Sequence, residues 1–313
     1  MADLATRVGS VELPTPVLMA SGCAAAGREM APFVDLGSVG GVVTKSIMAS
    51  PRAGRPTPRM VETPSGMLNS IGLQGPGIEA FLSEDLPWLL DQDARAVVSI
   101  AGSTIAEYGD LARRIAQAVD DGLRPHAVEV NISCPNVANR GLVFACDPVA
   151  SAQAVAAARA ALPDSLPMWV KLSPDVTDIV QIAVAAVDAG ADALCLVNTT
   201  LGMAIDHDTL RPRLGGVTGG LSGPAIRPIA VRCVYQVAAA LPDVPIVGIG
   251  GVQRGWDALE LLAAGASAVQ VGTAIFGDPA APARVAEEIS TALDERGTAC
   301  VRDVVGVAHE RNP

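Results

Sequence analysis

One hexapeptide, at residues 131–136, combines residue types that suit chemistry better than packing. It reads Asn-Ile-Ser-Cys-Pro-Asn and directly follows an apolar run, 126–130, that is typical of a buried strand. Pro135 lacks a backbone donor and prevents a helix from starting, so we expect a shaped loop. A thiol in such a loop can take up a proton near neutral pH if its environment assists. The alternative is a small buried cysteine in a turn.

Other polar side chains stand at the ends of apolar runs elsewhere in the chain. They are Lys45, Ser46, Ser99, Lys171, Asn198, Thr199 and Thr200. The two lysines are the most informative, because an unpaired buried ammonium group is costly. Their positions indicate a resident anion or an electron-rich ring.

Glycines follow the last two apolar runs, as Gly250-Gly251 and Gly272-Thr273, and each pair leads into a helical pattern. Such glycines let backbone N–H groups approach a phosphate closely at a helix start. Either pair alone could be an ordinary tight turn. Together they predict a phosphorylated cofactor. With Lys171 nearby to stabilise an anionic reduced ring, FMN fits.

Short apolar runs alternate with helical patterns along most of the chain. The runs, typical of parallel strands covered on both faces, are 17–20, 41–44, 96–100, 127–130, 168–172, 193–197, 245–249 and 268–271. The clearest helical patterns are 105–121, 147–162, 177–189, 224–241, 255–264 and 280–295. We predict one domain over 1–313, a (β/α)8 TIM barrel. A doubly wound open sheet is the alternative, although no Gly-x-Gly-x-x-Gly follows the first run.

Two long insertions interrupt this alternation, at 47–77 and 200–222, and both are rich in glycine. Each follows the carboxyl end of a predicted strand, which is the active face of such a barrel. We expect long binding loops or lids there.

Composition excludes several classes of protein. A net charge of −11 argues against a nucleic-acid surface. The six cysteines include no Cys-x-x-Cys pair, so we predict reduced thiols, no metal site and a cytoplasmic location. No apolar run approaches the roughly 20 residues of a membrane span.

Several segments together resemble class 1 dihydroorotate dehydrogenases. They are 69–77, 131–136, 218–226, 248–251 and 271–273, and the resemblance extends from about residue 17 to 276. A cysteine in the base position is similar to class 1, whereas class 2 uses serine. The forms of 69–77 and 218–226 resemble class 1B, the catalytic subunit of the NAD-linked enzyme of pyrimidine (UMP) biosynthesis.

The resemblance implies a role for each matching residue. Cys134 would be the base that takes a proton from C5 of dihydroorotate while hydride passes from C6 to the flavin. FMN would contact Ser21, Lys45, Ser46, Ser99, Asn131, Lys171, Val197, Gly223, Gly250, Gly251, Gly272 and Thr273. Substrate would contact Lys45, Asn69, Ser70, Ile71, Gly72, Leu73, Asn131, Asn136, Asn198 and Thr199. Two positions depart from the family pattern. Family members often have Asn at the position of Ser99, and many class 1B members have Asn at the position of Gly75.

The class 1B resemblance also implies a partner. This would be an electron-transfer subunit with FAD and a [2Fe–2S] cluster that reduces NAD+, in a heterotetramer of two catalytic and two electron-transfer subunits around a homodimer of this chain. The chain itself lacks a dinucleotide fingerprint and clustered cysteines. The alternatives are the fumarate-linked class 1A enzyme, a dihydropyrimidine dehydrogenase-like flavoenzyme, and a non-catalytic barrel that binds flavin or phosphate.

Overall fold

The computed structural model describes residues 1–133 and 144–310, and its centre is a closed ring of eight parallel strands. The ring comprises β3 (Val17–Met19), β4 (Gly41–Val43), β7 (Ala96–Ile100), β8 (Ala127–Asn131), β9 (Met168–Leu172), β10 (Ala193–Leu196), β13 (Ile246–Ile249) and β14 (Ala268–Val271). β14 pairs with β3 and closes the ring. Each predicted strand agrees with an observed one to within a residue at either end. The barrel prediction is confirmed and the open sheet is wrong.

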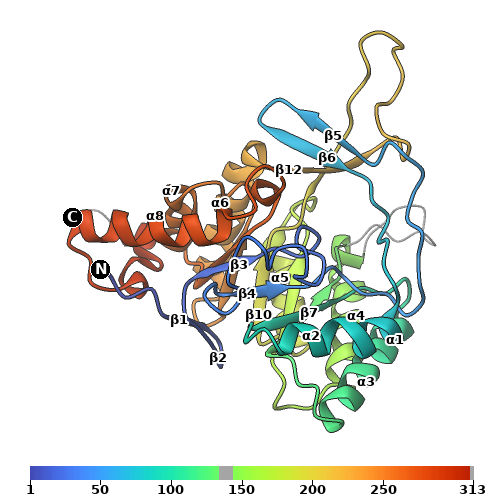
Figure 1. Cartoon of the computed structure of the whole chain (residues 1–313), viewed down its shortest axis with the longest axis horizontal. Helices are drawn as coiled ribbons and strands as arrows, with labels where there is room; N and C mark the ends of the chain where they lie inside the picture. The colour runs from blue at the N-terminus through green and yellow to red at the C-terminus, as the bar shows by residue number, and fades with distance from the viewer. Residues whose placement is uncertain (134–143, 311–313) are drawn as a thin grey trace.

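Helices form the outer layer of the barrel (Figure 1). They are α1 (Ile78–Ala80), α2 (Leu86–Leu90), α3 (Ile105–Asp120), α4 (Pro148–Arg159), α5 (Ile179–Asp188), α6 (Arg227–Ala240), α7 (Gly255–Ala263) and α8 (Ala281–Arg296). Thr104, Asp147 and Asp178 cap α3, α4 and α5 by accepting hydrogen bonds from first-turn amides. Shorter helical turns are η1 (Phe81–Asp85), η2 (Phe144–Cys146), η3 (Pro224–Ile226), η4 (Thr273–Phe276), η5 (Val301–Val304) and η6 (Val307–His309). No helix within the described ranges has the length and apolar character needed to cross a membrane.

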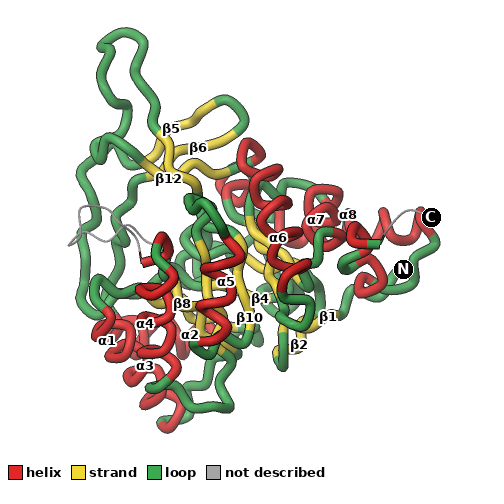
Figure 2. The backbone as a smooth tube through the Cα atoms, turned by 180° about the vertical axis from the view of Figure 1, so that it is seen from behind, coloured by secondary structure: helices red, strands yellow, loops and turns green. Residues whose placement is uncertain are grey.

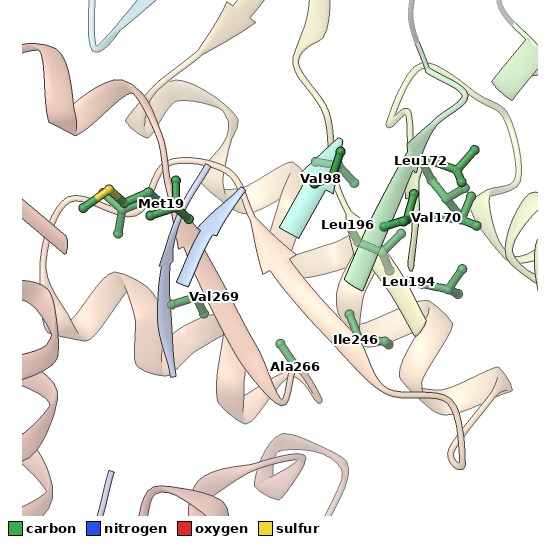
Figure 3. Close-up of a cluster of buried hydrophobic side chains, with 14 of the residues drawn as sticks. Met19, Val98, Val170, Leu172, Leu194, Leu196, Ile246, Ala266 and Val269 are labelled. Carbon is green, nitrogen blue, oxygen red and sulfur yellow. The ribbon is translucent and has the colours of Figure 1, made fainter. Parts of the chain in front are cut away.

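The ring strands are buried on both faces, which explains their nearly continuous hydrophobicity. Outward side chains such as Val98, Val170 and Leu196 pack beneath the helices (Figure 3). Inward side chains form a separate cluster around Leu18, Val97 and Trp169. This inner cluster includes apolar residues of a hairpin, β1 (Thr6–Val8) and β2 (Val11–Leu13), so the hairpin closes the amino-terminal end of the barrel.

The two insertions pair with each other, which the prediction of loops did not anticipate. They form an antiparallel sheet in the order β11 (Thr200–Gly202), β12 (Gly219–Ser222), β6 (Gly66–Asn69) and β5 (Met60–Thr63). This sheet stands apart from the ring strands, on the same side as the long loops (Figure 2). Segments 150 residues apart in sequence thereby form one structure at the mouth of the barrel.

Gly220 fixes how close this sheet approaches the barrel. A Cβ atom at this position would lie 2.0 Å from Thr199 Oγ1 and 2.7 Å from Thr199 Cβ. We therefore expect Gly220→Ala to lower the free energy of unfolding by about 1–3 kcal/mol, because the crowded strand must shift. Denaturant unfolding measures the change.

Gly75→Ala is the matched control for this prediction, since a Cβ atom there meets nothing within 4 Å. Its effect should stay within about 0.5 kcal/mol. Equal stability of the two variants would show that β12 tolerates displacement from Thr199.

Candidate active site

The side chains predicted to bind flavin come almost entirely from the carboxyl ends of the ring strands. Ser21 follows β3, Lys45 and Ser46 follow β4, Ser99 lies in β7, Asn131 ends β8, Lys171 lies in β9, Val197 follows β10, Gly250 and Gly251 follow β13, and Gly272 and Thr273 follow β14. Gly223 comes instead from the insertion and directly follows β12. The fold thus brings these residues to one rim.

Asn131 is the centre of a hydrogen-bonded cluster at this rim. Its Nδ2 donates to Ser46 Oγ at 3.0 Å, and Ser46 Oγ lies 2.9 Å from Ser99 Oγ. On its other side, Asn131 Oδ1 accepts from Ser133 Oγ at 2.9 Å and from Asn198 Nδ2 at 3.3 Å. Predicted cofactor and substrate residues therefore share one buried network.

Two ammonium groups face the same space. Lys171 is 4% exposed, and no hydrogen bond or ion pair joins it to another residue in the described part of the chain. Lys45 Nζ lies 3.4 Å from where a Cβ atom of Gly22 would stand. Burial raises the pKa of the Cys23 thiol to about 11, even though the charges of Lys171 and Lys45 oppose the shift. A buried cation such as Lys171, with no partner among the residues that the structure describes, indicates an anionic or electron-rich ligand.

Three glycines form a cradle at the same rim. Gly223, Gly250 and Gly251 have φ of +90°, +131° and +76°, values that side-chain-bearing residues rarely adopt. A Cβ atom on Gly251 would lie 3.0 Å from the carbonyl oxygen of Gly223. The amides of Gly223 and Gly251 donate to no acceptor within the described residues. Free N–H groups on closely approaching backbones are what a phosphate requires.

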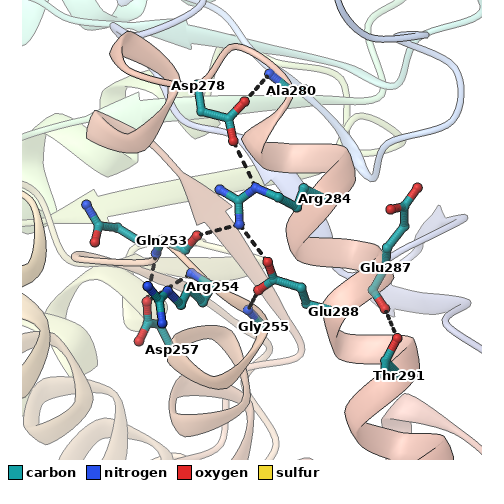
Figure 4. A network of polar contacts seen from close by, with 10 residues as sticks. All are labelled: Gln253, Arg254, Gly255, Asp257, Asp278, Ala280, Arg284, Glu287, Glu288 and Thr291. Carbon is teal, nitrogen blue, oxygen red and sulfur yellow. Dashed lines mark hydrogen bonds and ion pairs between the residues drawn. The ribbon is translucent and has the colours of Figure 1, made fainter.

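A polar network surrounds the loop that continues from the cradle glycines Gly250 and Gly251 (Figure 4). Asp257 accepts hydrogen bonds from the amides of Gln253 and Arg254, both at 2.9 Å. Arg284 on α8 donates to the Gln253 carbonyl at 3.2 Å and to Glu288 at 2.7 Å. These contacts tie the loop after β13, which also contains Gly250 and Gly251, to α7 and α8.

The predicted substrate loop, 69–73, reaches the cluster through β12. Asn69 Nδ2 donates to the Gly220 carbonyl at 3.3 Å, and Thr199 packs against the other side of Gly220. Ser70 is buried and accepts from Arg55 at 3.3 Å, so its hydroxyl supports the loop. The structure thus brings Asn69 and Thr199 close to Asn198, while Ile71, Gly72 and Leu73 stay half-buried beside Arg55.

Cys134 and Asn136 lie outside the described residues. Ser133, which precedes Cys134, donates to Asn131 Oδ1 and accepts from Asn198 Nδ2 at 2.5 Å. The chain therefore enters the predicted catalytic loop directly from the amide cluster.

Sequence reasoning missed Glu129 and Gln270, which are both fully buried inside the ring. Glu129 accepts from Ser99 Oγ at 3.0 Å and from Gln270 Nε2 at 3.2 Å. Burial, followed by the charge of Glu129, raises the pKa of the nearby Cys195 thiol well above its usual range. A carboxylate two residues before Asn131 in an apolar strand was the available signal, because alternate residues share a face.

Lys171 provides a direct test of whether the site is built for a ligand. Lys171→Met should raise the free energy of unfolding of the flavin-free protein, because it removes a buried charge that has no partner within residues 1–133 and 144–310. The same change should weaken FMN binding by roughly tenfold to a hundredfold, the value of a charge-assisted contact. Thermal unfolding and fluorescence titration with FMN measure the two effects. A less stable flavin-free variant would instead assign Lys171 a structural role.

Comparison with known proteins agrees with this geometry. The family model described as dihydroorotate dehydrogenase matches residues 3–293. The chain is 51% identical over 304 residues to the protein of Pelobacter propionicus named dihydroorotate dehydrogenase B (NAD(+)), catalytic subunit, covering 97% of this chain and 98% of the relative. Proteins of the same name from Geotalea uraniireducens and Geobacter sulfurreducens are each 49% identical, with 97% of both chains covered. The chain belongs to the dihydroorotate dehydrogenase family.

Proposed function

We propose that this chain oxidises dihydroorotate to orotate with FMN in pyrimidine biosynthesis, and that its electrons pass to NAD+ through a partner subunit. One observation carries the proposal: a buried lysine, Lys171, with no partner among the described residues, a glycine cradle and an amide cluster share one barrel mouth. Relatives that are 49% and 51% identical to this chain over 304 residues bear the name of this activity. A fold alone would support many chemistries.

The residues present fit FMN. The amides of Gly223 and Gly251 are available for its phosphate, and Thr273 stands beside them with its hydroxyl 2.8 Å from Ser222 Oγ. Lys171 would contact the electron-rich edge of a flavin ring, where a cation stabilises negative charge. Bound FMN would supply the acceptor for the hydride of the substrate.

Amide side chains suit the substrate, which is a ring of amides bearing one carboxylate. Each Asn offers a donor and an acceptor together, so Asn69, Asn131 and Asn198 can match the polar edges of the ring. Lys45 would bind the carboxylate. Held on these groups, the substrate presents a fixed face to the catalytic loop, and this fixed orientation lowers the entropic part of the barrier.

Cys134 would remove the C5 proton. Its thiolate sulfur takes the proton, and the electrons of the broken C–H bond form the new ring double bond as hydride leaves C6. The hydrogen bonds of Ser133 to Asn131 and Asn198 support this assignment, because they hold the residue that precedes Cys134 next to the side-chain amides that would bind substrate.

A second subunit would complete the electron path. The relatives are named catalytic subunits, which implies at least one other subunit. We assign FAD and a [2Fe–2S] cluster to that partner, in a heterotetramer around a homodimer of this chain. Exposed apolar side chains on the projecting insertion support assembly with other chains (Figure 1). They are Leu201, Met203, Ile205, Leu210 and Val217.

Replacing the proposed base should slow chemistry without loss of the cofactor. Cys134→Ala should bind FMN normally but reduce it with dihydroorotate on the order of 10²–10⁴-fold more slowly. Cys134→Ser should retain more activity, displaced to higher pH, because a hydroxyl is the weaker acid. Anaerobic stopped-flow absorbance measures the rate. An unchanged rate in Cys134→Ala would remove the thiol from the mechanism.

The electron acceptor separates the proposed class from its alternatives. The isolated chain should reduce an artificial dye with dihydroorotate and fail to reduce NAD+, and the partner subunit should restore NAD+ reduction. Steady-state assays with dye, NAD+ and fumarate make the comparison. NAD+ reduction by the chain alone would contradict the class 1B assignment. Turnover with fumarate would favour class 1A. Activity on dihydrouracil would favour a dihydropyrimidine dehydrogenase-like enzyme.

A further inference from the structure

Glu129 lies inside the barrel, one layer below the proposed substrate site. It is fully buried, and its register partners are Ser99 on β7 and Trp169 on β9. Residues directly opposite each other in a sheet point to the same face, and Trp169 belongs to the inner cluster, so Glu129 also points inward. Two donors reach it, Ser99 Oγ at 3.0 Å and Gln270 Nε2 at 3.2 Å, one on each carboxylate oxygen.

The Ser99 hydroxyl donates to Glu129 Oε1, and because a hydroxyl has a single proton, this bond sets the direction of every bond above it. The single hydroxyl proton of Ser99 points to Glu129, so Ser99 can only accept from Ser46, 2.9 Å away. The proton of Ser46 is thereby used as well. Asn131 must therefore approach Ser46 with its amide nitrogen, at 3.0 Å.

The orientation of the Asn131 amide follows from this chain of bonds. With Nδ2 turned to Ser46, Oδ1 faces the opposite side, where it accepts from Ser133 and from Asn198 Nδ2. The orientation of Asn198 is fixed independently, since its Oδ1 accepts from the amide of Thr199 at 2.8 Å. Each donor and acceptor between Glu129 and Asn198 has one consistent assignment.

We propose that Glu129 is a positioning residue for the substrate site, acting through Ser99 and Ser46 to fix which edge of the Asn131 amide faces the ligand. This inference rests on the proposed function for the identity of the ligand. Glu129 touches neither substrate nor cofactor by this account. It determines substrate affinity only through the two hydroxyls.

A double-mutant cycle with orotate tests the relay, using FMN-loaded protein and titration of the flavin spectrum. Glu129→Met removes the terminal acceptor and should weaken orotate binding about tenfold, the effect of one misdirected hydrogen bond. Ser99→Ala cuts the same relay nearer the site. In the Ser99→Ala background, Glu129→Met should cause no further loss, because Glu129 then has no connection to Asn131.

Glu129→Gln provides the conservative rescue and keeps the test decisive if Glu129→Met does not fold. A glutamine oxygen can still accept from Ser99. Its nitrogen would face Gln270 Nε2, so the Gln270 amide must turn over to present Oε1, which is buried and has no partner among the described residues. Glu129→Gln should therefore bind orotate as the unaltered protein does. Affinity as poor as that of Glu129→Met would show that charge acts directly, and would overturn the relay.

Trp169→Phe is the matched control, because Trp169 is the register neighbour of Glu129 in the same inner layer but makes no hydrogen bond to the relay within the described residues. Its orotate affinity should remain within about twofold of the unaltered protein. If Trp169→Phe lost as much orotate affinity as Glu129→Met, the inference would be overturned. The same holds if Glu129→Met had an equal effect in the unaltered protein and in the Ser99→Ala background. Either result would leave the proposed function intact. Failure of the unaltered protein to bind orotate would overturn both.

Discussion

The closure of eight parallel strands into one ring is the constraint on which the site depends. Closure brings eight carboxyl ends to one rim, while the β1–β2 hairpin covers the opposite end. Because side chains alternate, each strand contributes inward residues at successive heights. The lower layers are apolar, and the upper layers carry Ser99, Glu129, Asn131 and Lys171. The polar upper layers open only toward the insertions.

Charge distribution sharpens this contrast between layers. The whole sequence contains two lysines, Lys45 and Lys171, and both stand at the rim, whereas the remaining cations are arginines. Several surface arginines form ion pairs, as in the pairing of Arg284 with Glu288. A compact ammonium group at a barrel mouth suits a single ligand atom. Lys171 is buried with no hydrogen bond or ion pair to another described residue, which costs stability until a ligand binds. The buried charge of Lys171 therefore lowers the stability of the ligand-free protein and increases its affinity for an anionic ligand.

Sequence periodicity was sufficient for the ring and for most of its helices, because strands buried on both faces are continuously apolar. It was insufficient for the upper sheet, since the glycines of β12 resemble loop residues and gain their pairing from β6, far away in sequence. Helix 78–90 was missed as well, where a π-helical turn separates two short helices. Local pattern cannot report such long-range pairing.

The site residues were predictable where they follow a strand or form a glycine turn. Glu129 and Gln270 were not, because a single polar residue in an apolar strand gives no indication of its partners. Their pairing depends on the stagger between β8 and β14, which lie across the ring from each other. The direction of the hydrogen bonds that this pairing imposes on Asn131 therefore cannot be read from the sequence and follows only from the folded structure.

The central claim is that this barrel mouth holds FMN in a position to oxidise dihydroorotate. The most direct measurement is the visible spectrum of the purified, FMN-loaded chain during anaerobic addition of dihydroorotate. The account predicts that the flavin absorbance bleaches and that one orotate forms for each flavin reduced. Bound flavin that keeps its oxidised spectrum with excess dihydroorotate would contradict it.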